Sequence, residues 1–189
     1  MSTLEIIAVI VNVLGVWLTA RRIRWCWPVG VVAVSLYAWI FFDAKLYSDM
    51  LLQVLFAFLQ VYGWWRWSTG GLDHGKVHVG QLTLNEALLS LVIGALGAVL
   101  LGSLMASFTD AAVPWLDASL TAGSVVAGVW AARKYVASWW LWIVLDVVYV
   151  GMYLFKDLHL TAGLYVGFIV LAVYGWRAWR RDLLEQRTA

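Results

Sequence analysis

Charged residues are scarce in this sequence. Only 13% of its 189 residues are aspartate, glutamate, lysine or arginine, whereas soluble domains carry about 25%. Hydrophobic residues make up 63% of the chain, and the mean hydropathy is +0.83. A water-soluble globule of this size could not bury so much apolar surface. The composition therefore excludes an ordinary soluble domain and predicts an integral membrane protein.

Cysteine is nearly absent as well. The single cysteine, Cys26, excludes an intrachain disulfide. His74 and His78 fall in a polar loop and His159 at a helix end, with no cysteine pair beside them, so a metal site is not indicated. The chain also lacks the G-x-S-x-G nucleophile motif and a complete phosphate-binding motif ending in G-K-[ST]. We therefore expect neither an enzyme nor a bound cofactor.

Seven apolar runs are long enough, or nearly so, to cross a bilayer as helices. They cover residues 3–20, 27–42, 47–65, 84–107, 113–132, 138–155 and 158–176. Strict alternation typical of a membrane barrel is absent, and backbone groups in lipid must bond within their own segment. The N-terminal MSTLEIIAVI lacks the basic region of a secretory signal, so we expect the first run to be a true span.

The basic residues indicate an orientation. Eleven of the 13 lysines and arginines lie after the first, third, fifth and seventh runs. These are Arg21, Arg22, Arg24, Arg66, Lys76, Arg133, Lys134, Arg177, Arg180, Arg181 and Arg187. Only Lys45 and Lys156 fall on the other side. Since cytoplasmic loops carry the excess of lysine and arginine, we expect the N-terminus outside and the C-terminus in the cytoplasm.

The two ends of the chain resemble each other. GVWLTARR at Gly15–Arg22 matches GVWAARKY at Gly128–Tyr135, and Trp27 falls on Trp140 at the same offset of 113. VYGWWRW in the third run matches VYGWRAW in the seventh, at an offset of 112. Runs one to three therefore match runs five to seven, and the fourth run has no counterpart.

This pattern predicts an all-α membrane protein of seven transmembrane helices, built as two parallel three-helix repeats and a linker helix. The expected units are a first bundle over 1–67, a loop and linker helix over 68–112, and a second bundle with a basic tail over 113–189. Parallel repeats around a site near the midplane are typical of transporters. A receptor or assembly subunit built on a duplicated scaffold is the alternative from a different class.

The fourth run carries two local signals. Gly94, Ala98 and Gly102 place a small residue at every fourth position, which would let another helix approach closely. Ordinary use of glycine in a membrane helix is the alternative interpretation. Thr83 and Glu86 have the spacing of a capping box, so we expect the helix to begin directly after Thr83.

Asp146 lies near the middle of the sixth apolar run, where an aspartate costs about 2.5–3.5 kcal/mol to insert. We therefore expect it to face the protein interior or a wet cavity. At about 100° per residue, Trp139, Trp142, Tyr149 and Tyr153 share its helix face. A helix-packing role for Asp146 is the alternative interpretation.

Other polar residues in the spans are few. Gln53 and Gln60 lie on one stripe of the third run, where they could contact a substrate or bond between helices. Asn12 stands alone among aliphatic residues of the first run. Indole and phenol faces attract cations, and amides bind hydroxyls, so these groups together suit a flat cationic or aromatic molecule bearing a polyol.

Several tryptophans near the cytoplasmic boundary are expected to anchor the helices at the membrane interface. They are Trp25, Trp64, Trp65, Trp67, Trp176 and Trp179. Trp139 lies near the same boundary, so anchoring and substrate contact both stay open for it.

Two long stretches resemble a known family. WPVGVVAVSLYAWIFFDAKLYSDMLLQVLFAFLQVYGWWRW and WLWIVLDVVYVGMYLFKDLHLTAGLYVGFIVLAVYGWRAW are similar to the two halves of the PnuC family of vitamin transporters, with a W-x-x-W element at Trp139 and Trp142. The resemblance implies a bacterial inner-membrane protein with the 3+1+3 helix plan of full-length SWEET transporters and a homotrimeric assembly. It also implies facilitated diffusion of an unphosphorylated vitamin, nicotinamide riboside first, with thiamine or riboflavin as alternatives.

On this hypothesis the partners are a small vitamin and the bilayer, with no nucleic acid, and transport runs by alternating access. The residues expected to contact the substrate are Trp139, Trp142, Asp146, Tyr149, Gln53, Gln60 and Asn12. The two indoles would stack on the base and the carboxylate would balance its charge. The two glutamines would bind the ribose, assisted by the asparagine and the tyrosine. Thiamine, with its thiazolium, would satisfy the same logic.

Overall fold

The structure is a computed structural model, and its described secondary structure is helical apart from a short hairpin of two strands, each two residues long. It describes residues 3–43, 47–69, 72–73, 76–109, 113–155, 157 and 159–188. The helices are α1 (Thr3–Ala20), α2 (Cys26–Asp43), α3 (Tyr47–Thr69), α4 (Leu84–Phe108), α5 (Pro114–Ala132), α6 (Ala137–Phe155) and α7 (His159–Thr188), and the hairpin pairs β1 (Leu72–Asp73) with β2 (Lys76–Val77). The seven helices predicted from the apolar runs are confirmed.

Five segments of these helices are long and apolar enough to cross a membrane by themselves. They are Thr3–Ala20, Cys26–Asp43, Leu84–Phe108, Ala137–Phe155 and Thr161–Gln186. Within the described chain, α3 and α5 do not reach the same hydropathy, although we expected seven spans. For α5 the physical reason is its position, because it packs against α3, α4 and α6 together and so exposes less surface that must be apolar.

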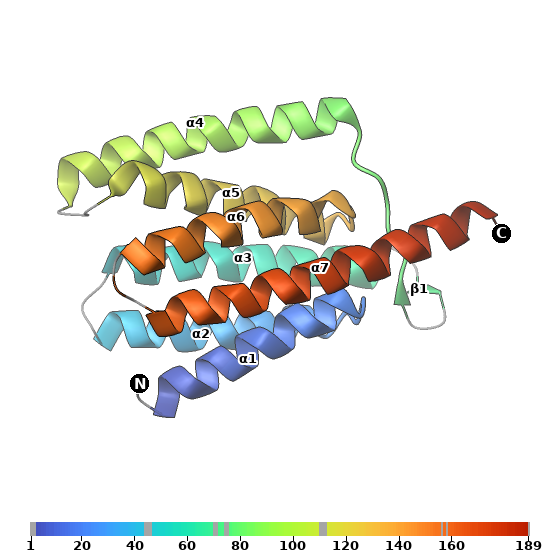
Figure 1. Ribbon diagram of the computed structural model, residues 1–189, viewed down its shortest axis with the longest axis horizontal. Coiled ribbons are helices and arrows are strands. Elements are labelled where there is room, and N and C mark those ends of the chain that lie inside the picture. Colours follow the sequence, from blue (N-terminus) through green and yellow to red (C-terminus); the bar gives the residue numbers. More distant parts are fainter. Residues whose placement is uncertain are drawn as a thin grey trace.

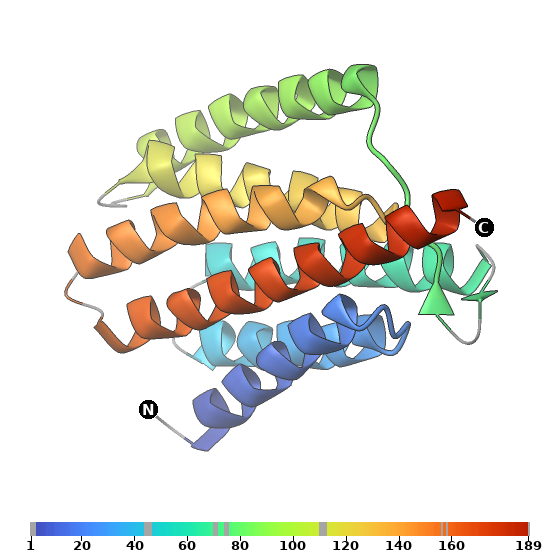
Figure 2. The ribbon, with the colours of Figure 1, turned by 45° about the vertical axis from the view of Figure 1, so that its right-hand side comes forward.

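Six of the helices form a closed ring. In order around it, α1 packs against α2, α2 against α3, α3 against α5, α5 against α6, α6 against α7, and α7 against α1. The remaining helix, α4, packs against α5 from outside the ring. Figures 1 and 2 show the helices running roughly alongside one another, with α4 at one edge of the molecule and α1 at the other. A site enclosed by both repeats would therefore lie in the interior of this ring.

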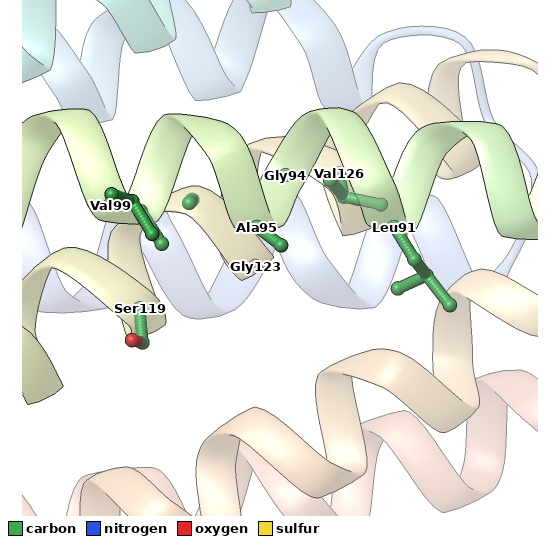
Figure 3. Close-up of a pocket in the computed structure, with 9 residues that line it drawn as sticks. Leu91, Gly94, Ala95, Val99, Ser119, Gly123 and Val126 are labelled. Carbon is green, nitrogen blue, oxygen red and sulfur yellow. The ribbon is translucent and has the colours of Figure 1, made fainter.

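Small residues on α4 allow its close approach to α5, as predicted. A Cβ atom built on Gly94 would lie 2.8 Å from a methyl group of Val126, and one built on Gly102 would lie 2.6 Å from the Trp115 ring. The two helices enclose a shallow apolar groove of about 400 Å³ (Figure 3). The predicted capping box is also confirmed. The Thr83 hydroxyl accepts from the Glu86 backbone N–H, and the Glu86 carboxylate accepts from the Thr83 N–H.

Basic residues gather at one end of the helices, which we call the basic end. Figure 1 places the α1–α2 connection, the hairpin, the α5–α6 connection and the C-terminus at this end, and the N-terminus at the other. Arg22 and Lys134, in the two helix connections, both have left-handed backbone conformations with φ of 58° and 69°. Lys45 and Lys156, expected at the opposite end, lie outside the described residues.

Candidate functional site

Asp146 faces the protein interior, as its sequence context predicts. The residue is only 5% exposed, while Val144 and Val147 beside it on α6 are exposed to the surroundings. Among the described residues, burial alone acts on its carboxyl group, with no hydrogen-bonding or charged partner. Its electrostatic neighbours include Tyr149 on α6 and Tyr165 on α7. The ring therefore holds a buried acceptor without a protein donor, which is the arrangement expected where a ligand binds.

Three tyrosines line the interior next to this carboxylate. The Tyr149 and Tyr153 rings stack at 5.9 Å with an angle of 15° between their planes. The Tyr165 ring lies 4.8 Å from the first and 5.1 Å from the second. Tyr149 was expected in the site, whereas Tyr165 was not. Aromatic faces packed this closely beside a carboxylate suit a flat cation.

The two tryptophans of the W-x-x-W element lie in different surroundings. Trp142 is half-buried and packs against both hydrophobic clusters of the interior. Trp139 is buried, its ring meets the Trp179 ring edge-on at 5.4 Å, and a Cβ atom on Gly175 would overlap it. The accessible ring of the pair is therefore that of Trp142.

The first three helices contribute amides. Gln60 on α3 is half-buried, and its side-chain amide lies so close to Gly30 on α2 that a Cβ atom there would overlap it. Gln53, seven residues earlier on α3, is half-buried too. Asn12 on α1 lies beside the hydroxyl of Tyr37 on α2, and Tyr37 in turn neighbours Tyr153 across the ring. All seven expected site residues thus have buried or half-buried side chains.

Residues 112 positions apart make matching contacts. Tyr37 neighbours Asn12, and Tyr149 neighbours Ser124, which stands 112 positions after Asn12. Likewise Tyr37 stacks on Phe41 as Tyr149 stacks on Tyr153. Tyr37 and Ser124 were not among the residues predicted for the site. The internal repeat was the signal that could have identified them, because each is the counterpart of a residue that was predicted.

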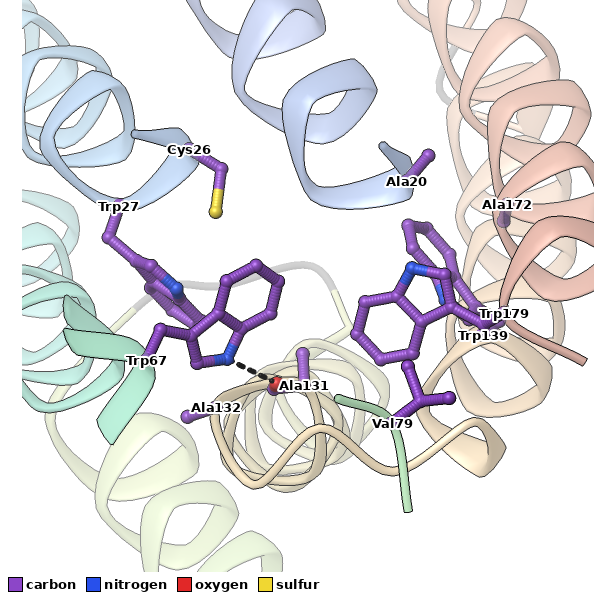
Figure 4. Packing of buried hydrophobic residues seen from close by; sticks show 10 residues of the cluster. All are labelled: Ala20, Cys26, Trp27, Trp67, Val79, Ala131, Ala132, Trp139, Ala172 and Trp179. Atoms are coloured by element: carbon purple, nitrogen blue, oxygen red, sulfur yellow. Dashed lines mark hydrogen bonds between the residues drawn. The ribbon is translucent and has the colours of Figure 1, made fainter. Parts of the chain in front are cut away.

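Four buried tryptophans, the tryptophan cluster, lie inside the ring toward the basic end (Figure 4). They are Trp27, Trp67, Trp139 and Trp179. Trp27 meets Trp67 edge-on at 5.4 Å, just as Trp139 meets Trp179. The expected match of Trp27 with Trp140 is therefore wrong by one residue, a turn of about 100° on a helix. Trp140 is instead 52% exposed.

The predicted interfacial role is also wrong for two of these residues. Trp67 and Trp179 are 0% exposed. Each indole N–H has a hydrogen-bond acceptor inside the protein. Trp67 Nε1 donates to the Ala131 carbonyl and Trp179 Nε1 to the Thr19 carbonyl, both at 3.2 Å. Trp25 and Trp65, by contrast, are 56% exposed and suit the anchoring role.

A family model of nicotinamide mononucleotide transporters matches residues 2–181 of the chain. The chain belongs to this family. It is 26% identical to the nicotinamide riboside transporter PnuC of Escherichia coli (strain K12), over 98% of this chain and 88% of that protein. It is 29% identical to the riboflavin/roseoflavin transporter RibM of Streptomyces davaonensis, over 90% of this chain and 84% of that protein.

A solved structure agrees with this assignment. The crystal structure of the vitamin B3 transporter PnuC superimposes with a TM-score of 0.78 at 25% identity, covering 96% of this chain and 82% of that one. The present protein is therefore a multi-pass membrane transporter of the PnuC family.

Proposed function

We propose that this protein carries nicotinamide riboside into the cell by facilitated diffusion. The observation that supports this most is Asp146, which is 5% exposed, has no hydrogen-bonding or charged partner among the described residues, and lies next to the stacked phenol rings. A pyridinium ring would supply the missing positive charge and lie against the aromatic faces. The half-buried amides of Gln53, Gln60 and Asn12 would bind the ribose hydroxyls. Trp142 and Tyr149 would stack on the base, with Trp139 behind them.

The charge distribution favours the unphosphorylated nucleoside over the nucleotide. None of the described lysine and arginine side chains is buried, whereas Asp146 is. A phosphate dianion in the ring would therefore meet a carboxylate and no cation. Since like charges at short range inside a protein repel strongly, the riboside is the substrate that the interior suits.

Transport would proceed by alternating access of two three-helix halves, α1–α3 and α5–α7, with α4 as the linker. Two observations support this arrangement. The two halves meet through the α3–α5 and α1–α7 contacts. These two contacts are equivalent, because α1 and α3 of the first half correspond to α5 and α7 of the second. Side chains 112 positions apart also make matching contacts. In this proposal the basic end is cytoplasmic, the N-terminus is outside, and three copies assemble in a bacterial inner membrane.

Riboflavin is the second candidate, because one relative of similar identity is a riboflavin/roseoflavin transporter. The isoalloxazine ring is flat but neutral, so it would leave the Asp146 carboxylate without a counter-charge. Thiamine carries a cation and would satisfy that carboxylate. Nicotinamide riboside, thiamine and riboflavin therefore differ in whether they carry a positive charge that can balance Asp146.

Calorimetric titration of the purified protein with nicotinamide riboside, nicotinamide mononucleotide, thiamine and riboflavin tests the proposal. We expect the riboside to bind at micromolar concentration or tighter, and each of the others at least about tenfold more weakly. Micromolar binding of thiamine or riboflavin without binding of the riboside would overturn the substrate assignment.

A further inference from the structure

The tryptophan cluster closes the ring at the basic end. Around its four rings pack small buried residues from α1 and α5, Ala20, Ala131 and Ala132. The segment after the hairpin adds to this closure. The Gly80 N–H donates to the Lys134 carbonyl at 2.9 Å, and the Val136 N–H donates to the Gly80 carbonyl at 3.2 Å. This short bridge holds the Val79 side chain against the cluster, where it is buried.

The polar contacts at this end run between the two proposed halves. Trp67 on α3 donates to Ala131 on α5, and Trp179 on α7 donates to Thr19 on α1. The two carbonyls are themselves 112 positions apart. The Trp67 and Trp179 rings then meet each other at 5.9 Å. Figure 4 shows Trp27 and Trp67 on one side of the cluster, facing Trp139 and Trp179 on the other.

An ion pair crosses at the same end. Arg22, in the α1–α2 connection, lies 2.7 Å from Asp182 on α7, and both side chains are half-buried. Separation of the α1–α3 half from the α5–α7 half would therefore break this pair, both indole hydrogen bonds and the ring contact together. Contacts within each half, such as Trp27 with Trp67, would persist.

The closed arrangement leaves two indoles unsatisfied. Trp27 Nε1 and Trp139 Nε1 are buried and have no acceptor among the described residues. A buried donor without a partner is unfavourable. Water or a passing polar solute would satisfy both when the two halves part. The closed cluster thus retains two donors that gain partners on opening.

We propose that Trp67 and Trp179 form the gate at the basic end, and that the substrate leaves the Asp146 site when these two residues separate. Each indole is fixed to the opposite half by one hydrogen bond, so the gate has two equivalent contacts and opens only when both are lost. Trp142 packs against the tryptophan cluster and against the cluster on the Asp146 side, so it connects the site with the gate. This inference rests on the proposed transport by two moving halves.

The single cysteine provides a reporter for the gate. Cys26, the first residue of α2, is 3% exposed and belongs to the same buried cluster. A maleimide reaches its thiol only when this end of the ring opens. The rate of Cys26 alkylation in the full-length protein, reconstituted in lipid, therefore measures gate opening without any substrate.

Trp67→Phe and Trp179→Phe each remove an indole donor and keep an aromatic ring. We expect each substitution to raise the alkylation rate about 2–10-fold, the effect of one net hydrogen bond on an opening equilibrium. We expect the two effects to be similar in size and to multiply in the double variant. Arg22→Gln should act in the same direction. Trp65→Phe, at an exposed position next to the gate, is the matched control and should leave the rate unchanged.

Unchanged alkylation in Trp67→Phe and Arg22→Gln would overturn the gate, as would an equal increase in Trp65→Phe. If Trp179→Phe does not fold, as judged by its elution from a sizing column, the other two variants decide the question. Because the assay needs no vitamin, failure of nicotinamide riboside binding and failure of the gate are distinguishable. Unchanged alkylation together with normal riboside binding removes the gate and leaves the proposed function standing.

Discussion

At the scale of single residues, equivalent positions in the two proposed halves carry different chemistry. Val34 on α2 stands 112 positions before Asp146 on α6, so only one half presents a carboxylate at this position. Gly30 is likewise the counterpart of Trp142, and the space that its missing side chain leaves is filled by Gln60. One half therefore offers an amide where the other offers an indole. This difference would let a nearly symmetric ring bind a molecule with a flat charged end and a hydroxylated end.

Asp146→Asn tests the charge. We expect the affinity for nicotinamide riboside to fall about 10–100-fold, because the pyridinium loses the opposite charge beside it. Dihydronicotinamide riboside, the neutral reduced analogue, should lose far less. Calorimetry with both ligands gives the comparison, and Asp43→Asn, at the exposed end of α2, is the control. Equal losses for the two ligands would assign Asp146 to helix packing.

Gly30→Ala tests the position of Gln60. A methyl group at this position would overlap the Gln60 amide, which must then move. We expect riboside affinity to fall about 2–10-fold, as for the loss of one neutral hydrogen bond. Gly167→Ala, on α7 with no atom within 4 Å of the added carbon, should have no effect in the same titration. An unchanged affinity in Gly30→Ala would exclude Gln60 from the site.

The sequence predicts an interior Asp146 because a carboxylate in lipid is costly, and this expectation holds. The same reasoning cannot place Trp67 and Trp179. An indole suits both a membrane interface and a buried position with an acceptor, and only the fold brings the Ala131 and Thr19 carbonyls within reach.

At the scale of helices, α4 has a separate role. It packs outside the ring against α5, and its first turn is fixed by the Thr83–Glu86 capping box and by Tyr135, whose hydroxyl donates to Glu86 at 2.6 Å. These contacts connect α4 to the α5–α6 connection without reaching the interior. A substitution in the first turn of α4 should therefore change the stability of the protein without changing its affinity for the substrate.

Thr83→Ala removes the capping hydroxyl and should destabilise the protein by about 1 kcal/mol. We expect a lower melting temperature in detergent and an unchanged riboside affinity. Thr109→Ala is a suitable control, because in the described part of the chain that hydroxyl donates to the Met105 carbonyl of its own helix. A fall in affinity with Thr83→Ala would show that α4 contributes to the site.

Hydropathy locates the helices well and their ends less well. The seventh run was expected to end at residue 176, but α7 continues to Thr188. Its last turns are rich in charged residues and lie at the basic end (Figure 2). Hydropathy identifies only segments that suit lipid, so it does not detect these turns. The moderate hydropathy of α5 has a different cause. Other helices rather than lipid surround much of it, so fewer of its residues need to be apolar.

At the scale of the whole molecule, the internal repeat predicts two parallel halves, but it does not predict how they meet. The α3–α5 and α1–α7 contacts join helices that are not consecutive in sequence, and their pairing depends on side-chain packing across the ring. The side-chain contacts also show that the two halves are offset by 112 residues. Trp139, and not Trp140, is the counterpart of Trp27, because Trp27 contacts Trp67 in the same way as Trp139 contacts Trp179.

The basic end should face the cytoplasm, given its excess of lysine and arginine. A C-terminal fusion to green fluorescent protein should then fluoresce in a bacterial host. Alkaline phosphatase fused after Thr109, at the opposite end, should be active. Activity of the phosphatase at the C-terminus and its absence after Thr109 would reverse the orientation.

The central claim is that a cationic nucleoside crosses the membrane through the six-helix ring, past Asp146. Counterflow of labelled nicotinamide riboside in proteoliposomes tests it most directly. We expect wild-type protein to accumulate label transiently when the vesicles are loaded with unlabelled riboside, without an ion gradient, and Asp146→Asn to lose most of this signal. Absence of counterflow by folded wild-type protein that still binds the riboside would contradict transport and favour a receptor. Full counterflow by Asp146→Asn would contradict the proposed path.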